Sequence, residues 1–397
     1  MCGITGIYLK EGKVDSRLLN RMTDTLKNRG PDDEGYFVRD KIGLGMRRLS
    51  IIDLETGNQP MKNEDGSVWV IFNGEIYNFK EIRKKLQEKN HKFVTNSDTE
   101  VLVHLYEEHG EDMVNHLNGM FAFAIWDERK KRLLLARDRL GIKPLYYYHD
   151  KNRFVFASEI KSIIEDRTIK RKVDLEALHY YIGYEYVPAP LTMYKGINKL
   201  DAGNMLIVED NEIRSKQYWD VKFKPQDKDE NYFIEKLIEL LKDSIEKRLI
   251  ADVPLGVFLS GGVDSSLLVA LMSEVTKEKI KTFSIGFKDQ SYNELDEARL
   301  IAEKYNTDHH EIVLEPDILE LIDKMTSYLD EPYADTSAIP VFLISNMTRA
   351  NIKVALSGDG GDELFAGYDR YLASKLDNIY SRLPAIVRDR VFGASKV

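Results

Sequence analysis

The sequence predicts two domains of different fold class: an α+β domain followed by an α/β domain built on a parallel sheet. Residues 1–208 consist largely of strand-forming segments with a few helices between them. The stretch 214–231 is polar and charged, which is typical of a linker. Beyond it, apolar strands alternate with helices, and this alternation favours a parallel sheet covered on both faces. We therefore expect domains at 1–213 and 232–397, joined by that linker.

In the first domain, β-branched and aromatic residues interrupted by polar turns mark the strands. The segments SVWVIFNGEIYN (67–78) and FAFAIWDERKKRLLLARDRLG (121–141) show this pattern most fully. Two segments, 79–90 and 99–110, have helical periodicity instead, and Gly110 supplies a helix end to the second. Strands with inserted helices indicate an α+β arrangement.

In the second domain, a helix is expected directly after the linker, because apolar residues recur there at helical spacing. The segments VPLGVFLS, KTFSIGF, HHEIVL and NIKVALSG are expected to follow as strands, with helices between them. The apolar residues on one face of that first helix are Phe233, Leu237, Leu241, Ile245 and Leu249.

The composition limits the class of protein. Of 397 residues, 43% are hydrophobic and 31% are charged, which is typical of a folded globular chain. The net charge of −9 at pH 7 argues against a general nucleic-acid or membrane surface. A single cysteine excludes a disulfide framework and fits a reducing, cytoplasmic compartment. The longest apolar runs are too short to span a bilayer.

The only cysteine is Cys2. If an aminopeptidase removes Met1, the thiol and a free α-amine lie on the same residue. The α-amine has an ordinary pKa of about 7.7–8.0, so a useful fraction is unprotonated near neutral pH and can take the thiol proton. Position and chemistry favour an N-terminal nucleophile. The alternative is a small buried hydrophobe, the commonest role of a lone cysteine.

A second candidate site is the loop SGGVDSS (260–266), which follows an apolar strand and opens a helix. Its glycines allow a tight turn, and its serines and the helix N-terminus suit a phosphate. The lysine of a Walker A motif is absent. Asp264 would repel phosphate unless Mg²⁺ came between them. The alternative is an ordinary strand–helix turn with capping serines.

The stretch SGDGGDE (357–363) also follows a predicted buried strand and carries acids among glycines. Parallel strands deliver their carboxyl ends to one crevice, so Asp264 and Asp362 are expected to converge on one metal ion and pyrophosphate. The alternative is a solvated acidic turn.

Taken together, these motifs resemble those of the glutamine-dependent asparagine synthetases. The strings MCGITG, NRGPDDEG, RRLSIID, FNGEIYN and TNSDTE resemble the class II glutamine amidotransferases. The loop SGGVDSS is similar to the pyrophosphate loop of the PP-loop ATP pyrophosphatases. The resemblance covers nearly all of the chain. It implies an N-terminal-nucleophile hydrolase sandwich (αββα) followed by a Rossmann-like PP-loop domain with a parallel sheet.

For the first domain, the resemblance implies that Cys2 attacks the glutamine amide, giving glutamate and ammonia. Asn73 and the N–H of Gly74 would form the oxyanion hole, whose donors act on charge that develops in the transition state. An arginine would hold the α-carboxylate and two acids the α-ammonium. The implied glutamine-binding residues are Arg48, Leu49, Ser50, Ile51, Ile52, Asn73, Gly74, Glu75 and Asp98.

For the second domain, the resemblance implies that ATP activates the side-chain carboxylate of aspartate as β-aspartyl-AMP, releasing pyrophosphate. Ammonia then displaces AMP. Asp264 and Asp362 would hold Mg²⁺, and Asp359 stands where the family often has a glutamate that supports formation of the intermediate. The implied ATP-binding residues are Phe258, Ser260, Gly261, Gly262, Asp264, Ser265, Ser266, Ile285, Ser357 and Gly358.

The resemblance leaves the acceptor open, because related surface-polysaccharide amidotransferases carry a similar variant of this second loop. A sugar acid is the alternative to aspartate. Family members usually continue well beyond position 397, which implies a shortened second domain and leaves a non-catalytic paralogue as a further alternative. The expected partners are glutamine, aspartate and ATP, with neither nucleic acid nor membrane, and a homodimer is left open.

Two weaker signals concern histidines and acids. His104, His109 and His116 lack the HExxH spacing of a zinc helix, so ordinary solvated or capping side chains are expected. His309 and His310 are expected to start a strand rather than to bind a metal. The acids of LDEPYADTSAIP (329–340) are expected either to border the ATP crevice or to form a plain acidic loop.

Overall fold

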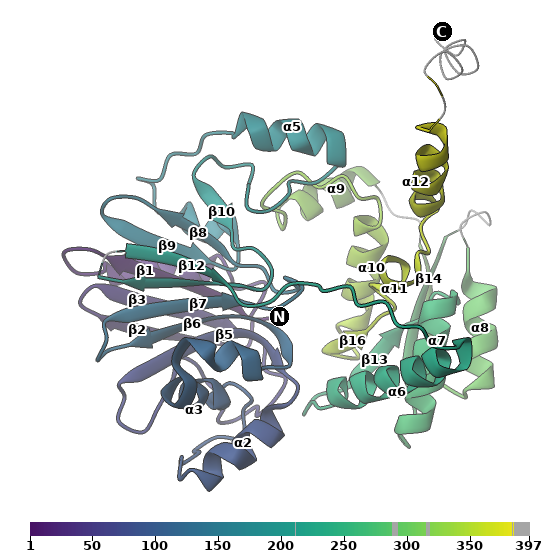
Figure 1. Cartoon of the computed structure of the whole chain (residues 1–397), viewed down its shortest axis with the longest axis horizontal. Coiled ribbons are helices and arrows are strands. Elements are labelled where there is room, and N and C mark those ends of the chain that lie inside the picture. The colour runs from purple at the N-terminus through teal and green to yellow at the C-terminus, as the bar shows by residue number, and fades with distance from the viewer. Residues whose placement is uncertain (211, 288–292, 315–317, 383, 385–397) are drawn as a thin grey trace. The chain divides into compact units, whose positions relative to one another are not determined.

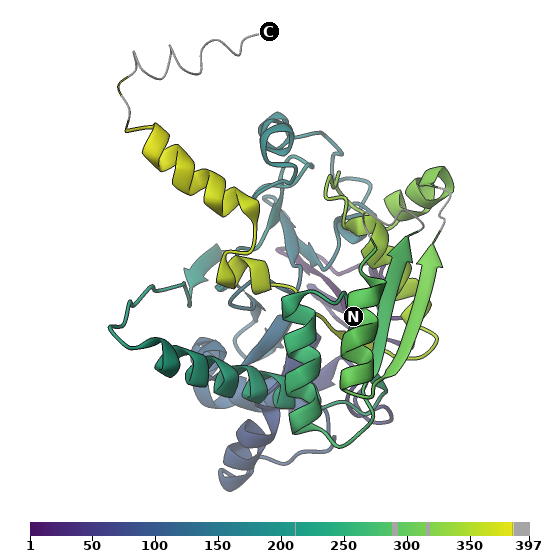
Figure 2. The ribbon, with the colours of Figure 1, turned by 90° about the vertical axis from the view of Figure 1, so that its right-hand side faces the viewer.

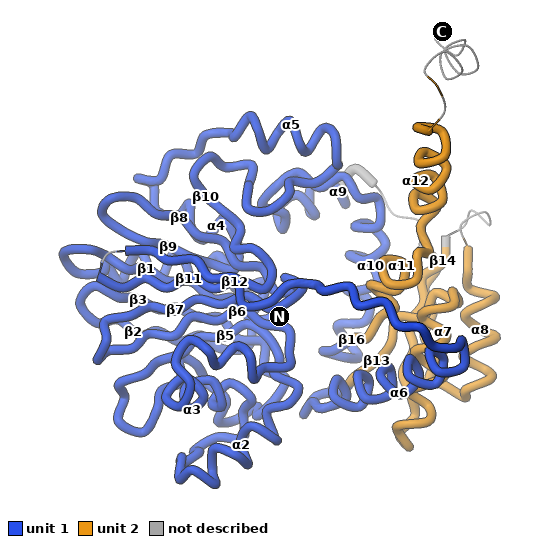
Figure 3. Tube along the Cα trace, viewed as in Figure 1, with its two compact units in different colours: residues 1–254, 316–354 blue, residues 255–315, 355–397 orange. Residues whose placement is uncertain are grey.

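The chain divides into two compact units in the computed structural model, which describes residues 1–210, 212–287, 293–314, 318–382 and 384 (Figure 1). Each unit is formed by two separate stretches of sequence (Figure 3). Among the described residues, none of the helices combines the length and the apolar character needed to cross a bilayer. Unit 1 comprises Met1–Pro254 and Pro316–Val354, and unit 2 comprises Leu255–Glu315 and Ala355–Val397.

Unit 1 is built on two six-stranded sheets, in the orders β10-β8-β9-β1-β3-β2 and β12-β11-β7-β6-β5-β4. Neighbouring strands pair antiparallel, for example β1 with β3 and β5 with β6. One hydrophobic cluster joins both sheets: Ile4 and Leu44 come from the first, and Ile71 and Ala124 from the second. The apolar face of each sheet is therefore buried against the other.

The first sheet contains β1 (Gly3–Leu9), β2 (Asp33–Arg39), β3 (Ile42–Arg48), β8 (Tyr146–His149), β9 (Arg153–Ala157) and β10 (Ile197–Lys199). The second contains β4 (Met61–Lys62), β5 (Val68–Ile76), β6 (Gly119–Asp127), β7 (Arg132–Arg137), β11 (Asn204–Glu209) and β12 (Glu212–Gln217).

Helices cover the outer face of each sheet. On the first sheet, α1 (Ser16–Asp24) packs on β1 and β3, and α4 (Ile160–Ile163) packs on β9. On the second, α2 (Phe79–Glu88) and α3 (Glu100–His109) share a core with β5 (Figure 1). The αββα sandwich is thereby confirmed.

The other helices of unit 1 are η1 (Gly110–His116, a 3₁₀ helix), α5 (Leu175–Tyr184), α6 (Glu230–Arg248), α9 (Ile318–Thr326) and α10 (Ala338–Thr348).

Two elements bear on the predicted linker at 214–231. Strand β12 covers its first four residues, 214–217, and α6 begins at Glu230. Along α6, Ile245 is buried, whereas Phe233 remains 47% exposed. The predicted helix is present, but its apolar stripe is buried only towards its C-terminal end.

Unit 2 carries a four-stranded sheet in the order β15-β14-β13-β16. Strand β13 pairs parallel with β14, and β14 pairs parallel with β15, so the predicted parallel sheet is confirmed. Figure 2 shows β14 and β15 side by side in green. The helices and strands of unit 2 are β13 (Leu255–Phe258), α7 (Val263–Val275), β14 (Lys281–Phe287), α8 (Leu295–Lys304), β15 (Asp308–Leu314), β16 (Val354–Leu356), α11 (Gly361–Phe365) and α12 (Asp369–Tyr380).

Candidate active sites

Cys2 lies directly before β1, where that strand pairs with the end of β3. The backbone N–H of Leu49 donates to its Sγ at 3.4 Å, and the thiol faces the Leu49 carbonyl at 3.7 Å. The side chain is partly buried. Burial raises the pKa of the Cys2 thiol, so the sulfur is protonated near neutral pH. A nucleophilic role therefore needs a base beside it.

The α-amine next to Cys2 has the properties of such a base. The side chain of Met1 is exposed, but its α-amine lies inward, and burial lowers the pKa of this amine from 8.0 to about 5. The positive charges of Arg29 and Lys143 act in the same direction. The α-amine of Met1 is therefore unprotonated at pH 7, and we expect the α-amine of Cys2, which replaces it once Met1 is removed, to act as the base.

Arg29 and Lys143 are two residues that the sequence reasoning missed. The Arg29 Nε donates to the Cys2 carbonyl at 2.9 Å, and its Nη1 pairs with Glu159 at 3.1 Å. Lys143 is 5% exposed, and burial lowers the pKa of its ammonium. Arg29 stands in the motif NRGPDDEG, which could have indicated it, whereas nothing in the local sequence distinguishes Lys143.

Asn73 and Gly74 lie on β5. Asn73 is fully buried, and in the described part of the chain neither Oδ1 nor Nδ2 of its side chain has a hydrogen-bond partner. Buried amides are normally paired, so an unpaired one suits a group kept for a ligand. A Cβ at Gly74 would come within 2.2 Å of the Met120 carbonyl oxygen, so only glycine fits against β6 here.

Glu75 and Asp98 are a pair of neighbouring acids, of which Asp98 is buried and Glu75 half-buried. Burial raises the pKa of Asp98 to about 6, although the Ile76 N–H donates to its Oδ2 at 2.9 Å. Burial and the neighbouring Asp98 raise the pKa of Glu75, and the charge of Lys143 opposes this shift. Two carboxyls with raised pKa values favour the arrival of a cation, which restores both charged forms.

Arg48 lies at the end of β3 and is buried. Its guanidinium donates to Asn58 Oδ1 at 2.9 Å and to the carbonyls of Ile52 at 3.0 Å and Asp53 at 2.6 Å. Part of its donor capacity therefore shapes the loop that follows Leu49. The predicted contact with a substrate carboxylate rests on the remaining N–H groups of the guanidinium, which carries five.

Ser50 and Ile51 are held through their backbones. The Ser50 N–H donates to Asp32 Oδ2 at 3.0 Å, and Lys353 Nζ donates to the same oxygen at 2.8 Å. The Ile51 carbonyl accepts from the Asp252 N–H at 2.9 Å. The loop predicted to line the glutamine pocket is therefore fixed by residues remote in sequence.

In unit 2, the loop SGGVDSS folds around its own hydroxyls. Ser260 Oγ and Ser265 Oγ lie 2.9 Å apart, and Ser266 Oγ donates to the Gly261 carbonyl at 3.2 Å. Gly261 has φ +87°, and a Cβ there would lie 2.6 Å from Glu297 Cβ. Gly262 is the N-cap residue of α7, and its backbone N–H donates to Ser260 Oγ at 3.2 Å. The glycines thus serve the turn that the sequence predicted.

The second loop of unit 2 lies against the first. A Cβ built on Gly361 would stand 2.3 Å from Asp264 Oδ2, and one on Gly358 would stand 3.0 Å from Asp264 Cβ. Ser357 Oγ donates to Asp359 Oδ2 at 2.8 Å. Asp264 therefore reaches the residue next to Asp362, and the convergence of the two carboxylates stays a prediction. Carboxylate oxygens beside glycine backbone fit Mg²⁺, which typically takes one or two carboxylates and completes its shell with phosphate oxygens and water.

Phe258 and Ile285 lie on the neighbouring strands β13 and β14, where Phe258 pairs with Phe283. Both positions are half-buried. Their predicted part, a main-chain contact with ATP, stays a prediction.

Two domain-family models match the chain. The glutamine amidotransferase domain matches residues 1–219, more than half of the chain, and the asparagine synthase domain matches residues 236–394. A putative glutamine-hydrolysing asparagine synthetase 2 of Methanocaldococcus jannaschii is 40% identical over 98% of this chain and 79% of its own length. The chain belongs to the glutamine-hydrolysing asparagine synthetase family.

Other members of this asparagine synthetase family are covered less fully. The glutamine-hydrolysing asparagine synthetase 1 of Bacillus subtilis is 38% identical over 97% of this chain, which spans 62% of that relative. A Gibberella zeae protein named amidase chry2 is 32% identical over 98% of this chain and 62% of its own length. The first of these two names specifies a synthetase and the second an amidase, so likeness alone leaves the substrate of this chain to be argued from its residues.

Proposed function

We propose that this chain hydrolyses glutamine at Cys2 and, in unit 2, uses ATP and Mg²⁺ to activate the side-chain carboxylate of aspartate for amidation to asparagine. The observations that carry the proposal are the Cys2 thiol, which the Leu49 N–H contacts, and the buried, unpaired amide of Asn73 on β5. The reaction would be a cytoplasmic ligation that yields glutamate, AMP and pyrophosphate with the product.

The first step is attack by Cys2. Once Met1 is removed, the α-amine belongs to Cys2 itself and takes the thiol proton. The sulfur forms a bond to the glutamine amide carbon, and the oxyanion that develops accepts hydrogen bonds from Asn73 Nδ2 and the Gly74 N–H. The C–N bond then breaks, ammonia leaves with the proton returned by the amine, and water hydrolyses the thioester to glutamate.

Glu75 and Asp98 would select glutamine by its α-ammonium. Burial holds the pKa values of both acids above their ordinary range, so their charged forms are costly without a cation. The substrate ammonium supplies that charge. Arg48 would hold the α-carboxylate through the N–H groups that do not already donate to the loop.

In unit 2, the serine hydroxyls and the backbone N–H groups at the start of α7 would donate to the phosphates of ATP. Asp264 and Asp362 would hold Mg²⁺, which when bound neutralises charge on the pyrophosphate leaving group. Ser357 holds Asp359 in place through its hydroxyl, and Asp359 would act where the family often has glutamate.

A second candidate keeps this chemistry and changes the acceptor to another carboxylate, such as a sugar acid. One observation favours this second candidate: Asp359 is one methylene shorter than the glutamate that the family often has at this position.

The test measures AMP, pyrophosphate and glutamate with ¹⁵N-amide glutamine, ATP and Mg²⁺, with and without aspartate. The proposal predicts that aspartate stimulates AMP release and that ¹⁵N appears in asparagine. AMP release that responds to a sugar acid but not to aspartate would transfer the assignment to the second candidate. Glutamate formation without any ATP turnover across the acceptors would contradict the synthetase part alone.

A further inference from the structure

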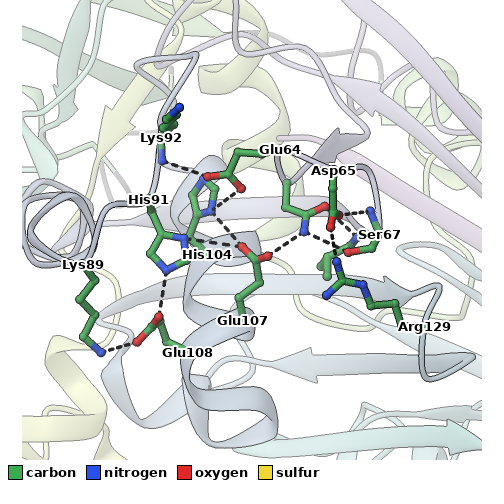
Figure 4. Close-up of polar contacts among 12 residues, drawn as sticks. Glu64, Asp65, Ser67, Lys89, His91, Lys92, His104, Glu107, Glu108 and Arg129 are labelled. Atoms are coloured by element: carbon green, nitrogen blue, oxygen red, sulfur yellow. Dashed lines mark hydrogen bonds and ion pairs between the residues drawn. The ribbon is translucent and has the colours of Figure 1, made fainter.

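A cluster of histidines and glutamates lies on the outer layer of unit 1, at the side of α3. Glu64 comes from the turn between β4 and β5, His91 follows α2, and His104 and Glu107 lie one turn apart on α3. Each offers one ligand atom, and these four atoms lie within 4.8 Å of one another. Figure 4 shows the two rings and two carboxylates facing a common point.

The prediction of solvated or capping histidines is wrong for His104. Its side chain is 1% exposed, and its Nδ1 lies 3.1 Å from Glu107 Oε2 and 3.7 Å from Glu64 Oε2. His91 Nδ1 lies 3.7 Å from the same Glu107 oxygen. His104 Nε2 is buried with no hydrogen-bond partner in the described part of the chain, so the ring makes its polar contacts through Nδ1 alone.

Three of the four side chains, those of Glu64, His91 and Glu107, are also held from outside the cluster by further residues. Asn63 Nδ2 donates to Glu107 Oε1 at 2.7 Å, and the Lys92 N–H donates to Glu64 Oε1 at 3.0 Å. His91 Nε2 lies 3.0 Å from Glu108 Oε1 (Figure 4). Outer partners of this kind orient metal ligands and fix the tautomer of a ligating histidine.

Charge also favours a cation here. The ring centroids of His91 and His104 are 4.8 Å apart, so two imidazolium charges would repel each other. Two neutral imidazoles with two carboxylates carry a charge of −2, which a divalent ion balances. Nitrogen and carboxylate ligands together suit Zn²⁺.

We propose that Glu64, His91, His104 and Glu107 form a structural Zn²⁺ site that ties the β4–β5 turn and the end of α2 to α3. A tetrahedral ion with ligand bonds of about 2.0–2.2 Å requires ligand atoms about 3.4 Å apart. The 3.1 and 3.7 Å separations need small adjustments, and pairs that lie up to 4.8 Å apart must approach by as much as about 1.4 Å when the ion binds. Glu64 is 41% exposed, and it provides both the adjustable ligand and a path of entry. Unlike the glutaminase assignment, the site does not depend on the proposed reaction.

The test titrates metal-free protein with Zn²⁺ and Co²⁺ in a Cys2→Ala background, so that the terminal thiol is not counted. One Zn²⁺ per chain and the intense visible absorption of tetrahedral Co²⁺ are expected. His91→Gln combined with Glu107→Gln should weaken Zn²⁺ binding by at least about 100-fold. The matched control is His116→Gln, which changes an exposed histidine of the neighbouring pair with His109. The control should bind as the parent does.

Either of two results would overturn the site: no Zn²⁺ bound to the parent, or equal affinity in the double variant and the His116→Gln control. Thermal unfolding of the metal-free proteins shows whether the double variant folds. If it does not, Glu64→Gln serves in its place, because this side chain is exposed, and Zn²⁺ should then raise the melting temperature of the parent more than that of Glu64→Gln.

Discussion

The two units prepare their candidate sites in different ways. Around Cys2, the functional side chains are buried: Asn73 is fully enclosed, and Asp98 is 4% exposed. In unit 2, Ser260 and Asp359 are exposed, and Asp264 is half-buried. Burial in unit 1 shifts pKa values and leaves an amide unpaired, so the pocket is arranged before glutamine binds. In unit 2 the backbone is arranged by glycines, while the side chains of Ser260 and Asp359 remain exposed to solvent.

The largest expected effect separates the two units. Cys2→Ala should lower the rate of glutamine hydrolysis by about 10⁴–10⁶-fold, because no other group can form the thioester. ATP binding, measured by calorimetry with Mg²⁺, should be unchanged. Residual hydrolysis within tenfold of the parent rate would contradict the assignment of Cys2 as the nucleophile.

The next effect tests whether the unit 1 pocket is prepared for charge in the transition state. Asn73→Ala should lower kcat for glutamine by about 10²–10³-fold with little change in KM, since the lost donor acts on the oxyanion. The control is Asn152, an exposed residue between β8 and β9, and Asn152→Ala should behave as the parent. An effect on KM alone would show that Asn73 binds ground-state substrate instead.

A third experiment tests the backbone arrangement of unit 2 with two glycines of similar φ. Gly261 has φ +87° and would place a Cβ 2.6 Å from Glu297 Cβ, whereas Gly360 has φ +93° with nothing within 4 Å. Gly360→Ala should lower the free energy of unfolding by about 1–2 kcal/mol, from the backbone alone. Gly261→Ala should lower it by about 2–5 kcal/mol, because overpacking adds to the strain. Denaturant titration of both proteins compares them, and equal losses would show that the close contact is absent.

The smallest effect concerns pH. Because the pKa of Asp98 is about 6, the carboxylate needed to pair with the substrate ammonium is lost as the pH falls below that value. The KM for glutamine should therefore rise up to about tenfold per pH unit below 6. In Asp98→Asn, KM should be high at every pH and should depend on pH less steeply, because only Glu75 still titrates, whereas the exposed control Asp112→Asn should keep the parent profile. A parent KM that is constant from pH 8 to pH 5 would remove Asp98 from ammonium recognition.

Local sequence signals predicted much of the fold and part of the candidate sites. The turn at Gly261 follows from two adjacent glycines between an apolar strand and a helix, and Cys2 follows from its position in the chain. The family resemblance implied the αββα layers, whereas helical and strand periods predicted an α+β first domain and the parallel sheet of the second. Each of these depends on residues close together in sequence, where backbone preference and side-chain period act directly.

The contacts that the sequence did not predict join distant segments. Asp330 and Glu331 were expected to border the ATP crevice or to form a plain acidic loop. Both accept hydrogen bonds from backbone N–H groups, Asp330 from that of Ile160 and Glu331 from that of Met193, and no signal in the sequence indicated either contact. His91 meets His104 only because the end of α2 packs beside α3. Such pairings depend on tertiary packing, and a single sequence carries no local signal for them.

The most direct test of the central claim is peptide mass spectrometry after reaction with a glutamine analogue that carries an electrophilic diazoketone. The account predicts one covalent adduct, on the sulfur of Cys2, in a peptide that begins at that residue because Met1 has been removed. An adduct on another residue, or full glutaminase activity in protein that retains Met1, would contradict it.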